Sequence, residues 1–147
     1  MADFAYRQLD VWQRGMDLVL AVYELANELP PNERFGLTSQ MQRAAVSVPA
    51  NIAEGYGRDH RGDYLRHLSF ARGSLMELET HLTIVVRLGY LNRQQVSPAW
   101  QLAQRVGQML TQLIRSLKTG SASKAVAFLE RRNKPRVHAF IGAFKLF

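Results

Sequence analysis

Apolar side chains recur at alternating intervals of three and four residues through four segments of the chain, the pattern of amphipathic helices. The segments cover roughly residues 9–29, 36–58, 63–88 and 97–118. No segment shows the two-residue alternation of a strand, and no solenoid-type repeat of about 20 to 50 residues is present. Because the connections are short, the pattern predicts an all-α protein, an antiparallel up-and-down four-helix bundle.

The first segment is apolar over most of its circumference. One stripe is expected to face the core of the bundle: Leu9, Trp12, Met16, Val19, Tyr23 and Ala26. A second ladder lies beside it: Val11, Leu18, Val22, Leu25 and Leu29. Such a helix needs burial on two sides, so the second side meets either another subunit or a broad core contact within one chain. Pro30–Pro31 and Gly36 end this helix and form the loop.

The second segment, GLTSQMQRAAVSVPANIAEGYGR, carries Pro49 in its middle. A proline inside a helix removes one backbone donor and presses on the carbonyl of residue Ala45, at a cost of about 3 kcal/mol. Either two short helices meet at residues 47–49, or one bent helix is held by its neighbours. The residues around Pro49 are small, so another backbone can approach closely. We therefore interpret residues 47–51 as determining the shape of the bundle.

The two faces of this second helix differ in polarity. The buried face is expected to hold Leu37, Met41, Ala45, Val48, Ile52 and Tyr56. The other face carries Gln40, Arg43, Ser47, Asn51 (or Ala50), Glu54 and Arg58. This polar face is either a functional surface or a solvated helix face. Glu54 and Arg58 are four residues apart and are expected to pair.

The third and fourth segments have clear stripes and end signals. Asp63 is the expected N-cap of the third helix and Gly89 its stop, while Ser97–Pro98 is the expected start of the fourth. The third stripe is Leu68, Ala71, Leu75, Leu78, Leu82 and Val85. The fourth is Ala99, Ala103, Val106, Leu110, Leu113 and Leu117.

Composition restricts the classes of protein to consider. A chain of 147 residues has the size of one domain and can bury a core. It has no cysteine, which excludes disulfides, thiolate zinc sites and a cysteine nucleophile and fits a reducing cytoplasm. The N-terminus lacks the pattern of a signal peptide, and no apolar run approaches the roughly 18 residues of a membrane span. We expect a cytoplasmic protein that does not enter the membrane.

The net charge of +7 is concentrated at the C-terminal end. Residues 1–118 hold 13 Lys/Arg against 11 Asp/Glu, whereas residues 119–147 hold six against one. We divide the chain accordingly into a bundle, 1–118, and a tail, 119–147. The tail is basic and also carries an apolar stripe of Val137, Phe140, Ile141 and Phe144. It predicts either contact with nucleic acid or an acidic surface, or a solvated extension.

Catalytic signatures are not found in the sequence. It contains no Gly-rich phosphate loop, no Gly-x-Ser-x-Gly elbow and no Glu-x-x-His pair of the di-iron bundles. Glu77 and His81 lie four residues apart, but one pair does not make a metal site, and a surface contact is expected. We predict no catalytic residues, no metal and no cofactor, and hence a protein that is not an enzyme.

The stretch from Gly36 to Arg58 resembles the signature of the four-helix-bundle family first noticed in reading frames within intervening sequences of bacterial 23S ribosomal RNA genes. The resemblance covers roughly residues 4–118. It extends to Leu9–Asp10–Val11–Trp12, Tyr23, Tyr64, Leu68, Ser74, Leu78, Glu79 and Leu88–Gly89–Tyr90.

The resemblance implies a bacterial protein, a left-handed bundle and assembly into a ring, commonly a homopentamer. The family is similar in fold to the accessory protein of diversity-generating retroelements, which works with a reverse transcriptase and binds nucleic acid through a basic surface. This chain departs from the family at Gln42, where a basic residue is common, and in residues 119–147, which extend past its usual end.

These features lead to two functional hypotheses. The first is a non-enzymatic homo-oligomer that binds RNA or DNA through phosphate contacts, since no aromatic side chains are expected among the exposed arginines to stack bases. The second is a scaffold or adaptor for a protein such as a reverse transcriptase. The candidate phosphate contacts are Arg43, Arg58, Arg61, Arg66, Arg105, Arg115, Arg131, Arg132, Lys134 and Arg136. The structural motif comprises Pro49, Asn51 and Glu54.

Overall fold

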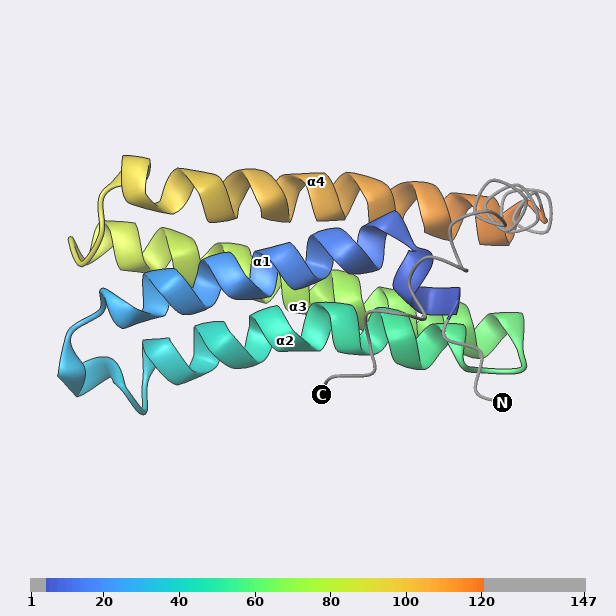
Figure 1. The fold of residues 1–147 in the computed structure, drawn as a ribbon, viewed down its shortest axis with the longest axis horizontal. Helices are drawn as coiled ribbons and strands as arrows, with labels where there is room; N and C mark the ends of the chain where they lie inside the picture. The colour runs from blue at the N-terminus through green and yellow to red at the C-terminus, as the bar shows by residue number, and fades with distance from the viewer. Residues whose placement is uncertain (1–4, 121–147) are drawn as a thin grey trace, which may run out of the picture. The chain divides into compact units, whose positions relative to one another are not determined.

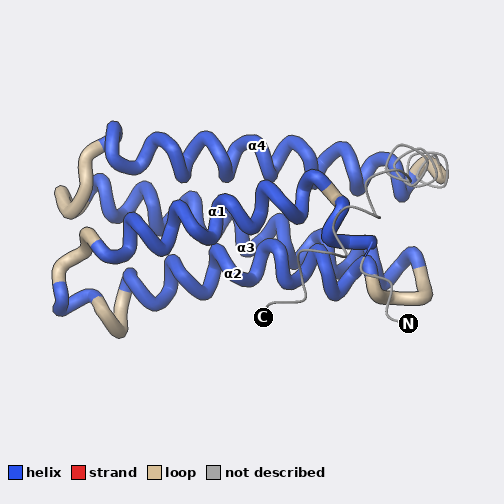
Figure 2. The backbone as a smooth tube through the Cα atoms, viewed as in Figure 1, coloured by secondary structure: helices blue, strands red, loops and turns tan. Residues whose placement is uncertain are grey.

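A computed structural model describes residues 5–120 of the chain. The helices are η1 (Ala5–Gln8), α1 (Asp10–Asn27), η2 (Pro31–Glu33), α2 (Leu37–Tyr56), α3 (Arg61–Arg87) and α4 (Arg93–Lys118). Figure 2 shows helices joined by short loops, with no strand among the described residues. Successive long helices run in opposite directions (Figure 1), so the predicted all-α four-helix bundle is confirmed.

The chain divides into two compact units, Met1–Gln112 and Leu113–Phe147, and α4 passes from one to the other. The first unit holds α1, α2, α3 and α4 as far as Gln112.

The buried side of α1 is not the one that the spacing alone favours. Val11, Leu18 and Val22 of the second ladder are buried, together with Leu9, Ala26 and Leu29. Met16 and Tyr23 of the predicted inward stripe are exposed, and so is Leu20. The prediction was therefore wrong for Met16 and Tyr23, because both sides of α1 are apolar and periodicity does not choose between them.

Pro49 does not divide α2 into two helices, since α2 is continuous from Leu37 to Tyr56. The proline is buried, and its ring lies against Gly15 of α1. A Cβ placed on Gly15 would be only 3.3 Å from the Pro49 Cβ. The close approach expected near Pro49 is confirmed, and the absence of a side chain at Gly15 makes room for the ring.

A second glycine sets the spacing between α2 and α3. A Cβ on Gly55 would lie 2.8 Å from the Cβ of His67 and 2.8 Å from Cδ2 of Tyr64. Both atoms belong to the first turns of α3. The two helices therefore approach most closely where α2 ends, and this approach brings His67 against the polar residues of α2.

The stripe of α3 is buried as predicted. Its six members, Leu68, Ala71, Leu75, Leu78, Leu82 and Val85, are each at most 3% exposed. The helix ends at Gly89, whose φ of 76° suits a residue without a side chain. The N–H groups of Gly89 and Tyr90 donate to the carbonyls of Val86 and Val85, closing a Schellman motif. The N-cap is His60 and not Asp63, which lies in the first turn.

The fourth helix begins earlier than predicted. Asn92 and Gln95 form a reciprocal capping box, in which each backbone N–H donates to the other's side-chain oxygen at 2.9 Å. Ser97–Pro98, the predicted start, therefore lies inside α4. Within the first unit, Ala99, Ala103, Val106 and Leu110 are buried as predicted.

Aromatic side chains pack where η1, the end of α2 and the start of α3 meet. Tyr6 contacts both Trp12 and Tyr56, with ring centroids 5.5 and 6.5 Å apart, and Tyr56 contacts Tyr64 at 6.1 Å. Burial, followed by the neighbouring Tyr56, raises the pKa of Tyr64 above its usual value. The Tyr64 hydroxyl therefore stays neutral at physiological pH.

None of the helices among residues 5–120 combines the length and the apolar character that crossing a membrane requires.

Candidate functional site

The described candidate arginines are all exposed, and they occupy separate parts of the fold. Arg58, Arg61 and Arg66 lie at the turn between α2 and α3. Arg43 lies in α2, 13 positions before the last residue of that helix, Tyr56, which is a helical rise of about 20 Å. Arg105 follows Gln104, which donates a 3.0 Å hydrogen bond to Glu79 in the second half of α3. Three of these arginines therefore lie within nine consecutive residues around one turn, whereas Arg43 and Arg105 lie elsewhere.

The other candidates belong to the second unit or beyond. Arg115 is an exposed residue of the unit that begins at Leu113. Arg131, Arg132, Lys134 and Arg136 lie outside the described residues.

The arginines at the turn differ in their partners. Arg58 forms an ion pair with Glu54, as the spacing of the two residues predicted. Arg61 and Arg66 form no ion pair with an acidic side chain of residues 5–120. The positive charge of Arg58 is thus already balanced, while Arg61 and Arg66 are the cations available to a phosphate.

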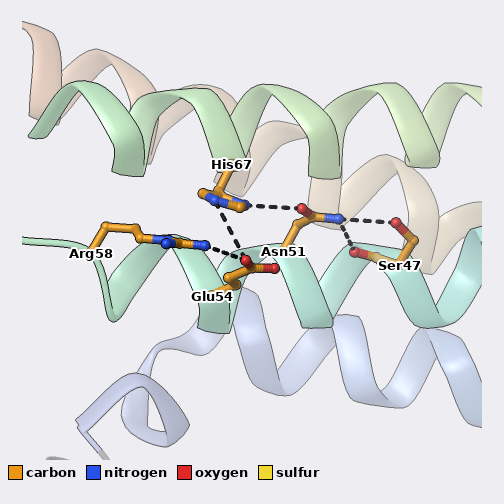
Figure 3. A network of polar contacts seen from close by, with 5 residues as sticks. All are labelled: Ser47, Asn51, Glu54, Arg58 and His67. Carbon is orange, nitrogen blue, oxygen red and sulfur yellow. Dashed lines mark hydrogen bonds and ion pairs between the residues drawn. The ribbon is translucent and has the colours of Figure 1, made fainter. Parts of the chain in front are cut away.

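A chain of polar contacts joins α2 to α3 beside this turn (Figure 3). The Asn51 side-chain amide donates to the backbone carbonyl of Ser47 at 2.9 Å and to its hydroxyl at 3.0 Å. Its carbonyl oxygen faces Nδ1 of His67 at 3.2 Å. Since Asn51 Oδ1 only accepts, His67 Nδ1 is the donor. The Ser47 hydroxyl also contacts the Ser74 hydroxyl at 2.8 Å.

The opposite nitrogen of the His67 ring lies 3.8 Å from Oε1 of Glu54, the carboxylate that pairs with Arg58 (Figure 3). His67 is therefore held on one side by Asn51 and faces a carboxylate on the other. Ser47 and Asn51 are half-buried in this seam. The prediction of an outer polar face is therefore wrong for Ser47 and Asn51, because α3 covers that side of α2, whereas Ala50, the alternative to Asn51, is exposed.

An exposed aromatic ring stands next to the free arginines. Phe70 is 48% exposed, and the Arg66 guanidinium lies over its ring, 5.5 Å from the centroid. The His67 ring meets Phe70 edge-to-face, with centroids 5.8 Å apart. One aromatic ring therefore accompanies one of the candidate arginines, a contact that the sequence reading did not predict.

The exposed position of Phe70 beside Arg66 could have been predicted from the sequence. It lies off the buried stripe formed by Leu68, Ala71 and Leu75, and it follows Arg66 by four residues. Residues at that spacing are neighbours on a helix surface.

A second surface feature lies between α1 and α2. An open recess of about 480 Å³ is lined by Tyr23, Ser39, Gln42, Arg43, Val46 and Ser47. Met16, Leu20 and Tyr23 follow one another at helical spacing on α1, and all three are exposed. Val46 of α2, also exposed, shares the recess with Tyr23. We call the three α1 residues Met16, Leu20 and Tyr23, together with their α2 neighbour Val46, the α1 apolar face.

The opposite end of the first unit is tied together by Glu33. One carboxylate oxygen accepts the N–H of Leu37 at the start of α2, and the other accepts the hydroxyl of Tyr90 at 3.0 Å. The hydrogen bond to Glu33, followed by burial and the charge of that carboxylate, raises the pKa of Tyr90. The function of this contact is to join two loops far apart in the sequence.

The pair formed by Glu77 and His81 is not a surface contact, since His81 is buried and only Glu77 is exposed. The distance between Nε2 of His81 and Oε1 of Glu77 is 3.3 Å. Among residues 5–120, no three His, Asp or Glu side chains gather closely enough to hold a metal ion.

Comparison with known proteins places the first unit in a described group. A family model described as "23S rRNA-intervening sequence protein" matches residues 7–112. A solved crystal structure, of a protein with unknown function from the S23 ribosomal protein family of Bacteroides thetaiotaomicron, has a similar fold with a TM-score of 0.66. The two chains are 23% identical, and the similarity covers 71% of this chain and 97% of that one. No curated protein matches the chain.

Proposed function

Because the chain belongs to the family of 23S rRNA-intervening sequence proteins, we propose that it is a non-catalytic bundle that assembles with copies of itself and binds RNA or DNA. The observation that carries the nucleic-acid part is the pair of exposed arginines, Arg61 and Arg66, which have no acidic partner among residues 5–120. Phosphate contacts of this kind position a nucleic acid without reading its sequence.

The charge around the turn explains why assembly matters for binding. Glu54, Asp59 and Asp63 offset much of the positive charge of the three arginines at the turn. One subunit alone therefore attracts phosphate weakly. An assembly presents the same arginines several times to one strand, so its avidity exceeds the affinity of a single site.

The α1 apolar face supports self-assembly. Leu20 is 64% exposed, and its three companions are each about two-fifths exposed. An exposed apolar cluster beside a recess is typical of protein contact surfaces. The resemblance to the ring-forming family extends this proposal to a homopentamer. The scaffold hypothesis, with a partner such as a reverse transcriptase, uses the same face for a different protein.

Nucleic-acid binding is tested by fluorescence anisotropy of a labelled RNA strand, titrated with the full chain at several salt concentrations. The double variant Arg61→Glu with Arg66→Glu is expected to bind roughly ten-fold more weakly or worse. The slope of the logarithm of its binding constant against the logarithm of salt concentration should also be smaller by about one for each lost phosphate contact. Arg87→Glu with Arg93→Glu is the matched control, because Arg87 lies at the other end of α3, about 39 Å from Arg61. Absence of binding by the wild type at low salt contradicts the proposal.

Self-assembly is tested by light scattering of the full chain at micromolar concentration. The wild type is expected to have the mass of several chains, and Leu20→Asp is expected to lower that mass. Met76→Asp is the control, since Met76 is a similarly exposed apolar residue of α3. A wild-type monomer refutes self-assembly. A monomer that captures a reverse transcriptase through Leu20 would favour the scaffold hypothesis instead.

A further inference from the structure

The contacts of Phe70 distinguish it from the other exposed apolar residues of α3. Met76 and Ile84 are also exposed, but neither has an aromatic ring on which a flat ligand could stack. Phe70 is flanked by a guanidinium and by an imidazole ring. We call Arg66 and Phe70 the stacking pair. Both side chains are planar, and the guanidinium of Arg66 lies over the ring of Phe70.

The stacking pair rests on an ordered support. His67 contacts the Phe70 ring and is itself fixed by Asn51, which is bound to Ser47 one turn earlier in α2. Gly55 keeps α2 close enough for this contact to form. The aromatic ring is therefore positioned before any ligand arrives, which lowers the entropy lost on binding.

The surface beside the ring is open. Gly73 follows Phe70 by three residues, so it is a neighbour on the helix surface, and a Cβ there would meet nothing within 4 Å. A flat ligand can thus approach the ring without displacing a side chain on that side. On α3 the carboxylates of Asp63 and Glu77 lie seven residues before and after Phe70, each about 10 Å along the helix, and Asp63 precedes Arg66 by three residues. The Glu54 carboxylate across the seam is neutralised by Arg58.

From these observations we infer that Phe70 of the stacking pair stacks on an unpaired nucleobase, and that the positive charge of Arg66 attracts the adjoining phosphate. This inference rests on the proposed nucleic-acid binding and names its ligand as single-stranded RNA or DNA. Bases inside a duplex are stacked on one another and offer no free face to a side chain. Every base has such a face when unpaired, so the site distinguishes single strands from duplexes but does not distinguish one base from another.

The test compares a labelled single strand of mixed sequence with the blunt duplex that it forms with its complement. Phe70→Leu removes the aromatic face and keeps apolar bulk, whereas Phe70→Trp keeps a larger aromatic face. We expect Phe70→Leu to weaken single-strand binding roughly five- to hundred-fold, the usual range for one base–aromatic stack, and to leave duplex binding within about two-fold. Phe70→Trp is expected to bind the single strand at least as well as the wild type.

A strand carrying 2-aminopurine reports stacking directly, because stacking quenches its fluorescence. Quenching by the wild type and by Phe70→Trp, but not by Phe70→Leu, supports the inference. Met76→Leu is the control for substitution of an exposed apolar residue on the same helix.

The outcomes separate this inference from the proposed function. Wild-type binding that Phe70→Leu leaves unchanged, or weakens equally for strand and duplex, overturns the stacking site while nucleic-acid binding stands. A loss of oligomer mass in Phe70→Leu would show that Phe70 contacts another copy of the chain, and would also overturn it. Failure of the wild type to bind either probe at low salt removes the proposed function and the stacking site with it.

Discussion

Replacement of Gly55 by alanine tests the close approach of α2 and α3 on which the seam depends. The added Cβ would stand 2.8 Å from two atoms of α3 and 3.2 Å from the carbonyl oxygen of Tyr64. One of these atoms is the Cβ of His67, and another is backbone, so neither moves aside by rotation of a flexible side chain. The helices must separate, or His67 and Tyr64 must leave their positions.

The magnitude follows from two opposing terms. Overpacking a well-packed contact costs about 1–3 kcal/mol. Alanine is a better helix former than glycine by about 1 kcal/mol in a helix interior. Gly55 is the penultimate residue of α2, where that gain is smaller. We therefore expect Gly55→Ala to lower the free energy of unfolding by about 1–2 kcal/mol, and Tm by roughly 3–8 °C.

Gly73→Ala is the matched control, because it makes the same chemical change in the middle of α3 with nothing within 4 Å of the new methyl group. It should raise the free energy of unfolding by about 0.5–1 kcal/mol. Urea unfolding followed by circular dichroism measures both variants, with Tm as a second readout. If Gly55→Ala stabilises the protein as Gly73→Ala does, the close approach of α2 and α3 is refuted.

Two further predictions concern the ends of helices. Asn92→Ala should lower the free energy of unfolding by about 1 kcal/mol, because it removes the cap of α4, whereas Ser97→Ala should change it little. Urea unfolding measures both variants. A larger loss in Ser97→Ala than in Asn92→Ala would show that Ser97 is the cap after all. Because the pKa of Tyr90 is raised by its hydrogen bond to Glu33, that bond stabilises the fold at neutral pH and is lost as the pH rises through the alkaline range where tyrosine ionises. Wild-type Tm should then fall more steeply above about pH 10 than that of Tyr90→Phe, and parallel curves would contradict this.

The sequence by itself determined the number and type of the helices. The α3 stripe was fully predictable, because its six apolar residues follow one another at three-four spacing, whereas the remaining surface is mainly polar with only scattered apolar residues. Gly89 as the stop of α3 was also predictable, since few other residues adopt its positive φ. The pairing of Glu54 with Arg58 follows from spacing along one helix and needs no other part of the fold.

Only the tertiary structure decided which side of α1 is buried, because both sides are apolar and the choice depends on what packs against them. It also decided the role of Pro49, which is accommodated by Gly15, a residue 34 positions away in the sequence. The seam from Ser47 to His67 likewise joins two helices, so no periodicity within one helix could reveal it. The position of Phe70 off the buried stripe is visible in the sequence, but its contacts with both Arg66 and His67 depend on the fold, which holds His67 against α2. Patterns along one helix report what that helix can bury, whereas the partner that covers each side is a property of the assembled fold.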